Sequence, residues 1–121
     1  MAECLNLVRK IDISTFHPSA FTFYFSNMNL NEFKASLLNA QPPKGITAEL
    51  QALWFDAKND WEQAHIIAQD IKGKNGSWIH AYLHRKEGDQ FNADYWYAKA
   101  GKKSPPISLQ EEWEELFADM I

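Results

Sequence analysis

The sequence predicts an all-α domain of five or six helices, and three observations support this fold class. Apolar residues recur at helical spacing along most of the chain after residue 28, between residues that begin or end helices. Two segments, 47–71 and 77–101, each contain two such helices joined by a short turn, which makes an antiparallel hairpin. The period-two alternation of a strand occurs at Phe21, Phe23 and Phe25, where it has no partner strand.

The composition narrows the classes of function. A chain of 121 residues predicts one domain spanning 1–121. Its net charge of −4 does not favour nucleic-acid binding, because phosphate neutralisation needs a basic patch. No apolar run approaches the ~20 residues of a membrane helix, and the first residues lack a signal-peptide pattern. Cys4 is the single cysteine, which fits a reducing compartment. We therefore expect a cytoplasmic protein with neither nucleic acid nor membrane as a partner.

Residues 1–28 predict an extended arm that precedes the helices. Two interpretations of the arm stay open: its phenylalanines pack on the helical core of the same chain, or the arm is exchanged with a second subunit in a homodimer. Residues 29–40 predict the first helix, because Asn29 and Glu32 have the spacing of a capping box.

Capping residues also mark the hairpins. In 47–71, Thr47 is expected to cap the first helix and Asp60 the second. In 77–101, Ser77 is expected to cap the first helix, and a Gly-Asp pair turns the chain into the second.

A final helix over 108–120 is expected to cap the end of the stack. Ser108 and Glu111 have the spacing of a capping box. The apolar side of this helix is formed by Leu109, Trp113, Leu116, Phe117 and Met120. Its opposite side is expected to be a solvated acidic face, made of Glu111, Glu112, Glu114 and Glu115.

The two hairpins read as copies of one unit at an offset of about 29 residues. The turn at 58–60 corresponds to the turn at 87–89, and Ala64 corresponds to Ala93. Apolar positions also map onto apolar positions: Leu50 onto Ile79, Leu53 onto Tyr82, and Trp54 onto Leu83. Such repeats predict helical hairpins stacked side by side.

Two resemblances follow from these residues. The hairpins resemble tetratricopeptide-type repeats, although the offset is shorter than that family's usual ~34 residues and its Gly and Pro signatures are mostly missing. The stretch WIHAYLHRKEGD followed by NADYWYAKAG, within Trp78–Gly101, resembles a family of uncharacterised small helical bacterial proteins. That resemblance covers roughly Ala64 to Trp113, implies an all-helical fold and brings no known activity.

The functional surface predicted from the sequence is a stripe on the helix that follows Trp78. His80, His84 and Glu87 stand at i, i+4 and i+7, so they lie on one side of that helix. In stacked hairpins the first helices line one concave surface. The residues 29 positions before the stripe, on the first helix of the other hairpin, are therefore expected to lie beside it. The candidate groove therefore combines His80, His84 and Glu87 with Gln51, Phe55, Lys58 and the neighbouring Arg85.

Four interpretations of this stripe compete. Two histidines one turn apart with a carboxylate a turn further have the spacing of a metal site, with His80, His84 and Glu87 as ligands. No third histidine is placed securely, because His65 stands on a different helix. A catalytic role would use a histidine with Glu87 or Asp94 as acid and base. A structural role would have the histidines hydrogen-bonded at a half-buried seam. The fourth interpretation is recognition of a peptide or protein by the groove.

The return helix over 91–100 carries aromatic residues on nearly every side, which is typical of a helix packed between neighbours. The alternative is an aromatic-lined pocket in which tyrosine hydroxyls and Arg85 orient a small ligand. Arg85 is expected to pair with Asp89, with Asp94 or with an acidic residue on another helix.

The leading hypothesis from the sequence is a non-enzymatic interaction or scaffold module that binds a peptide or protein in the groove and needs no cofactor. The alternative is a small metal- or ligand-dependent enzyme that uses the stripe of His80, His84 and Glu87.

Overall fold

The computed structural model describes residues 28–121, and all regular secondary structure in that range is helical. The all-α fold class is therefore confirmed for these residues. The extended arm predicted over residues 1–28 and its exchange between subunits fall almost entirely outside the described part of the chain. None of the helices in residues 28–121 combines the length and the apolar character that a bilayer crossing requires.

The first described helix, α3, spans Leu30–Ser36 and forms a unit with the residues up to Ile46. Its predicted capping box is present: the Asn29 side chain accepts from the Glu32 amide at 2.8 Å, and the Glu32 carboxylate accepts from the Asn29 amide at 3.0 Å. The helix ends earlier than the predicted residue 40. At its end the Ser36 hydroxyl donates to the carbonyl of Phe33 at 2.5 Å, and the following amides make i→i−3 bonds that tighten the chain into a turn.

The second unit, Thr47–Met120, begins with the first hairpin. Helix α4 spans Ala48–Ala57 and α5 spans Trp61–Gln69. Thr47 caps α4 by accepting from the Leu50 amide at 3.2 Å, and Asp60 caps α5 by accepting from the Gln63 amide at 3.1 Å. Both predicted caps are therefore confirmed, and α4 packs against α5.

The second hairpin consists of α6, Lys74–Lys86, and α7, Gln90–Lys99. The prediction that Ser77 caps α6 is wrong, because the helix begins four residues earlier than expected, at Lys74, and its N-cap is Gly73. Gly76 in the first turn explains how this start is reached. A Cβ atom there would lie 2.0 Å from the carbonyl oxygen of Ile71, so only glycine lets the backbone pass so close to the end of the first hairpin.

The turns of the two hairpins have the same hydrogen bonds at the 29-residue offset. The Asp60 amide donates to the Phe55 carbonyl at 2.9 Å, and the Asp89 amide donates to the His84 carbonyl at 2.9 Å. Asn59 and Gly88 occupy the same left-handed position, with φ of 64° and 91°. The predicted correspondence of turn with turn therefore extends to the backbone geometry.

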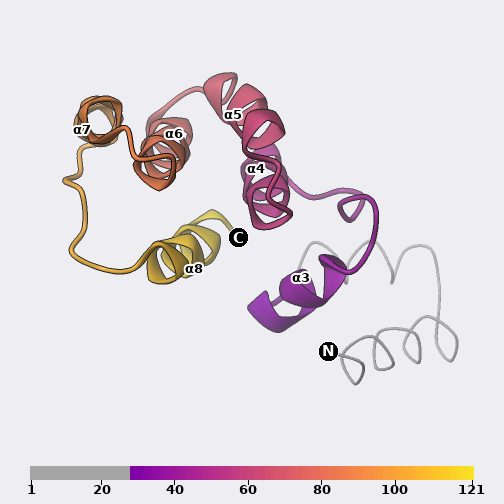
Figure 1. Ribbon diagram of the computed structural model, residues 1–121. Coiled ribbons are helices and arrows are strands. Elements are labelled where there is room, and N and C mark those ends of the chain that lie inside the picture. The colour runs from indigo at the N-terminus through magenta and orange to yellow at the C-terminus, as the bar shows by residue number, and fades with distance from the viewer. Residues whose placement is uncertain (1–27) are drawn as a thin grey trace, which may run out of the picture. The chain divides into compact units, whose positions relative to one another are not determined.

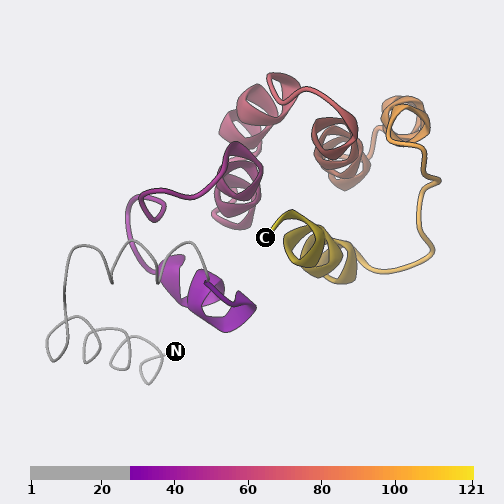
Figure 2. The same cartoon turned by 180° about the vertical axis from the view of Figure 1, so that it is seen from behind.

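Helix α8, Leu109–Met120, follows α7 after a loop and packs against α4 and α6. Figures 1 and 2 show α4 to α7 in a curved row, with α8 on its inner side, facing α4 and α6. The Ser108–Glu111 capping box is present, with both bonds at 3.0 Å. The predicted apolar side of α8 is largely buried, including Trp113, Leu116 and Phe117. The Trp113 indole donates to the Leu53 carbonyl at 3.1 Å and so joins α8 to α4.

One prediction for α8 is wrong: Glu112 does not belong to the solvated acidic face but is 0% exposed. Its carboxylate accepts hydrogen bonds from the Trp78 indole at 3.1 Å, from the Tyr97 hydroxyl at 2.7 and 2.9 Å, and from the Arg85 guanidinium at 2.6 Å. These donors compensate the cost of burying the Glu112 carboxylate. We call this set of residues the Glu112 centre.

Candidate metal centre

His80 and His84 lie one turn apart on α6, a helix packed between α5 on one side and α7 on the other. Side chains at i and i+4 project from the same face of a helix, so the two imidazoles stand one above the other. Their ring centroids are 4.9 Å apart and their planes differ by 21°. The two histidines of the predicted stripe are therefore stacked on each other.

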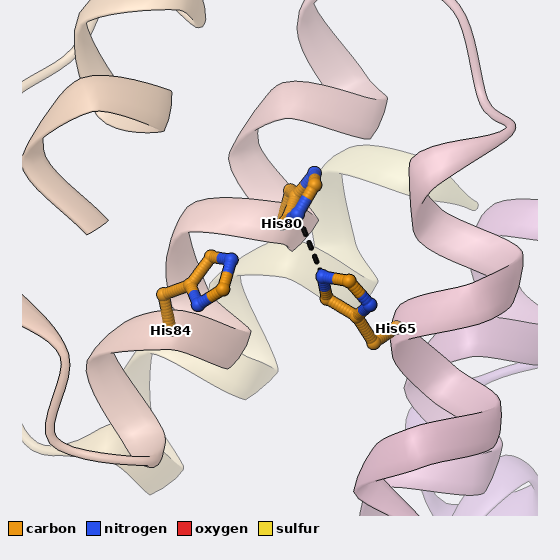
Figure 3. Close-up of side chains that lie close together, drawn as sticks. All are labelled: His65, His80 and His84. Atoms are coloured by element: carbon orange, nitrogen blue, oxygen red, sulfur yellow. Dashed lines mark hydrogen bonds between the residues drawn. The ribbon is translucent and has the colours of Figure 1, made fainter. Parts of the chain in front are cut away.

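The histidine of the other hairpin, His65 on α5, completes the group (Figure 3). Its Nε2 atom lies 2.8 Å from Nε2 of His80, a hydrogen bond in which one imidazole donates and the other accepts. The ring of His65 is also 5.3 Å from that of His84. We refer to His65, His80 and His84 as the histidine cluster.

Two tryptophans cover faces of the imidazoles. Trp96 of α7 stacks on His80 with centroids 4.0 Å apart and planes 16° from parallel. Trp61 of α5 stacks on His65 at 4.8 Å, and its indole donates to the Leu83 carbonyl at 2.7 Å. These rings fix the orientation of the imidazoles and limit the access of water to them. His80 consequently retains 6% of its surface.

Glu87 orients the third histidine. Its carboxylate oxygen Oε2 lies 2.7 Å from Nδ1 of His84, so that nitrogen donates to the carboxylate and Nε2 is the ring nitrogen left for another partner. Figure 3 shows the remaining ring nitrogen of His84 on the side that faces His80 and His65. A carboxylate on one imidazole nitrogen and a metal ion on the other is the usual arrangement around metal-ligating histidines.

The environment keeps the buried imidazoles neutral. Burial lowers the pKa of His80 to about 4, with further contributions from the positive charges that His65 and His84 would carry. Burial and the charge of His84 also lower the pKa of His65, and the Glu87 carboxylate offsets part of that effect. Neutral imidazole is the form that binds a metal ion, so neither side chain has to lose a proton at neutral pH.

Each residue of the histidine cluster offers one ligand atom, and these atoms all lie within 4.8 Å of one another. Ligands of a tetrahedral zinc ion, at ~2.0–2.1 Å from the metal, are roughly 3.3 Å apart, so side-chain adjustments of about 1 Å would form the site. A second group, His84, Glu87 and Asp89, has the same compactness but is more exposed. All-imidazole coordination suits zinc, copper, nickel and iron rather than calcium or magnesium.

The remaining residues of the predicted groove have other surroundings. Of the three partners predicted for Arg85, the structure has an acidic residue on another helix. The Arg85 guanidinium lies 2.6 Å from the Glu112 carboxylate and also donates to the Ile107 carbonyl. Phe55 packs edge-on against Trp54, and Lys58 lies 5.3 Å from the centroid of the same indole. Gln51 is half-buried on α4.

The ring contacts around His80 and His84 come from α5 and α7, whereas the groove was predicted between α4 and α6. Sequence reasoning missed His65, Trp61 and Trp96 as parts of the site. The signal was present for Trp61 and His65, which stand at i and i+4 near the start of a helix and so share one face of α5. The packing of one hairpin on the next decides which face of α5 contacts α6. The local sequence does not predict this face.

Comparisons of the chain with protein-family models, with curated proteins and with solved structures find no match.

Proposed function

We propose that this chain is a small non-enzymatic helical module that binds one divalent transition-metal ion of the zinc class through His65, His80 and His84. The observation that carries the proposal is the convergence of three imidazole nitrogens, from two different hairpins, to within 4.8 Å. The hydrogen bond of His84 to Glu87 supports it, because it leaves one nitrogen of His84 for the metal.

A metal ion held in this way would join the two hairpins. His65 belongs to α5, and the two other ligands belong to α6. Because α5 and α6 already pack against each other, the ion would strengthen an existing interface. Binding to the folded state alone raises the free energy of unfolding, by ~2.7 kcal/mol at a free concentration 100 times Kd.

Calorimetric titration of the metal-free chain with Zn²⁺ tests the proposal. We expect one ion per chain and loss of at least ten-fold in affinity in each of His65→Gln, His80→Gln and His84→Gln. Two controls accompany the titration: His17→Gln, which removes a histidine from outside the described residues, and Mg²⁺, which an all-nitrogen site does not favour. Unchanged zinc affinity in all three cluster variants would show that the histidines serve packing alone.

A second candidate function is recognition of a peptide or protein, the leading hypothesis from the sequence. One observation favours it: Phe91 is 85% exposed and Tyr95 is 53% exposed, one turn apart on α7. Large exposed aromatic side chains on one helix face are typical of interaction surfaces. Replacement of Phe91 by Ser would weaken capture of such a partner and leave zinc binding unchanged.

Two further proposals concern the class of the protein. The backbone hydrogen bonds that the two hairpin turns share at the 29-residue offset support a relation to tetratricopeptide-type repeats. The single cysteine supports a cytoplasmic location.

A further inference from the structure

The histidine cluster provides three ligands, and the nature of the fourth follows from its neighbours. Zinc prefers four ligands, and sites with three protein ligands complete the coordination with water or a small molecule. Within residues 28–121, the compact group around His65 contains the three histidines and no carboxylate. Glu87 and Asp89 group with His84 instead, and Glu87 contacts Nδ1, the nitrogen across the ring from the one that faces the cluster.

The approach to this fourth position is set by the burial of the three rings. His80 is buried and has Trp96 stacked on it at 4.0 Å, so its side of the cluster is covered. The side chain of His84 keeps 12% of its surface, and His65 is half-buried. Trp61 covers one face of His65 and meets His84 with centroids 5.9 Å apart. Because His65 and His84 still keep more exposure than His80, a ligand from solvent would reach a bound ion from the side of these two rings.

The charges around that approach select the kind of ligand. Three neutral imidazoles leave the full double charge on a bound metal ion, which favours an anion or a water molecule that loses a proton. Glu87 and Asp89 place their carboxylates beside the His84 ring, and at this short range they repel ions that carry several negative charges. This approach thus suits water, hydroxide or a small monoanion better than phosphate.

We infer that the metal ion bound by His65, His80 and His84 keeps one coordination position open on the His84 side and takes water or a small monoanion there. This inference rests on the proposed metal binding. It specifies the coordination of the bound ion: three histidine nitrogens from the protein and one exchangeable ligand from solvent.

Cobalt substitution tests the inference, because the visible spectrum of Co²⁺ reports its coordination. The full chain is loaded with Co²⁺, and azide or inorganic phosphate is then added at constant ionic strength. We expect visible bands upon loading and a saturable change of these bands with azide, at a concentration at least ten-fold lower than any effect of phosphate. Glu87→Gln should bind azide about threefold more tightly, since one repelling charge is removed. Glu115→Gln, an equal change of charge on exposed α8 surface, should leave azide binding unchanged.

The outcomes separate the two proposals. If the chain shows no stoichiometric Co²⁺ or Zn²⁺ binding, the metal site itself is wrong and the inference falls with it. If Co²⁺ binds through the three histidines and its spectrum does not respond to azide, the metal site stands and its fourth position is closed by the protein, which overturns the inference. An equal response to azide and phosphate would overturn the selection by charge.

Discussion

The Glu112 centre and the histidine cluster are both polar groups at the packing surfaces of α6, and they differ in how their polar atoms are used. At the Glu112 centre a carboxylate accepts from an indole, a tyrosine hydroxyl and a guanidinium, and it is 0% exposed. In the histidine cluster three imidazoles share one hydrogen bond between His65 and His80 and one from His84 to Glu87.

This difference distinguishes a structural polar group from one suited to a ligand. Removal of Glu112 or Arg85 leaves the other charge of the pair without its counter-charge, so the centre is expected to hold α6, α7 and α8 together. The imidazole–imidazole bond of the cluster is a neutral hydrogen bond, whose net contribution to stability is about 1 kcal/mol. A metal ion can replace that bond at little cost, and three nitrogen ligands are then already close together.

The largest effect should follow from breaking the Glu112 centre. Glu112→Gln removes the charge opposite Arg85, and we expect the free energy of unfolding to fall by about 3 kcal/mol in chemical denaturation. Glu115→Gln on the exposed side of α8 should change it by less than about 0.5 kcal/mol. Similar values for the two variants would contradict the structural role of the centre.

A smaller effect should appear on acidification of the metal-free protein. The pKa of His80 is about 4 when folded, below its ordinary value of about 6.5, so the unfolded chain binds more protons between these pH values. The contribution of neutral His80 is complete above pH ~6.5 and is lost as the pH falls toward 4, which lowers the free energy of unfolding by about 2 kcal/mol.

Chemical denaturation at pH 7 and pH 4.5, in the presence of a chelator, measures this effect. The comparison is made with His80→Gln, because carboxylates such as Asp89 and Glu111, whose hydrogen bonds lower their pKa, also titrate in acid. The loss between the two pH values should be smaller in His80→Gln. An equal loss in both proteins would mean that His80 does not titrate as its burial implies.

The smallest of these effects concerns the residue that orients His84. Glu87→Gln keeps a hydrogen-bonding partner for Nδ1 and removes the carboxylate charge, so we expect zinc affinity to fall about tenfold. The free energy of unfolding without metal should change by less than about 0.5 kcal/mol, because Glu87 is exposed. A loss of stability equal to the loss of affinity would place Glu87 among the packing residues.

The sequence predicted most of the fold because its signals are local. Asn29, Thr47, Asp60 and Ser108 all cap helices as expected, since a cap needs only the residue and the amides that follow it. The prediction of a cap at Ser77 was wrong because the contact that decides the start of α6 is not local. The close approach of Gly76 to Ile71 allows the helix to begin at Lys74.

The site was predicted in part. His80 and His84 lie on α6 and Glu87 is its C-cap, so their spacing alone brought these three residues together. His65 comes from the other hairpin, and its distance from His80 depends on how the hairpins pack. Glu112 was assigned to the solvated face although its spacing indicates the buried one. It stands three residues after Leu109 and four before Leu116, within the apolar stripe of α8.

The most direct test of the metal site is a long-range proton–nitrogen NMR correlation of the histidine rings, recorded without metal and after one equivalent of Zn²⁺. We expect neutral imidazoles for His65 and His80 before addition, and coordinated ring nitrogens for His65, His80 and His84 after it. Spectra in which those three rings stay unchanged while the metal is present would contradict the proposed function.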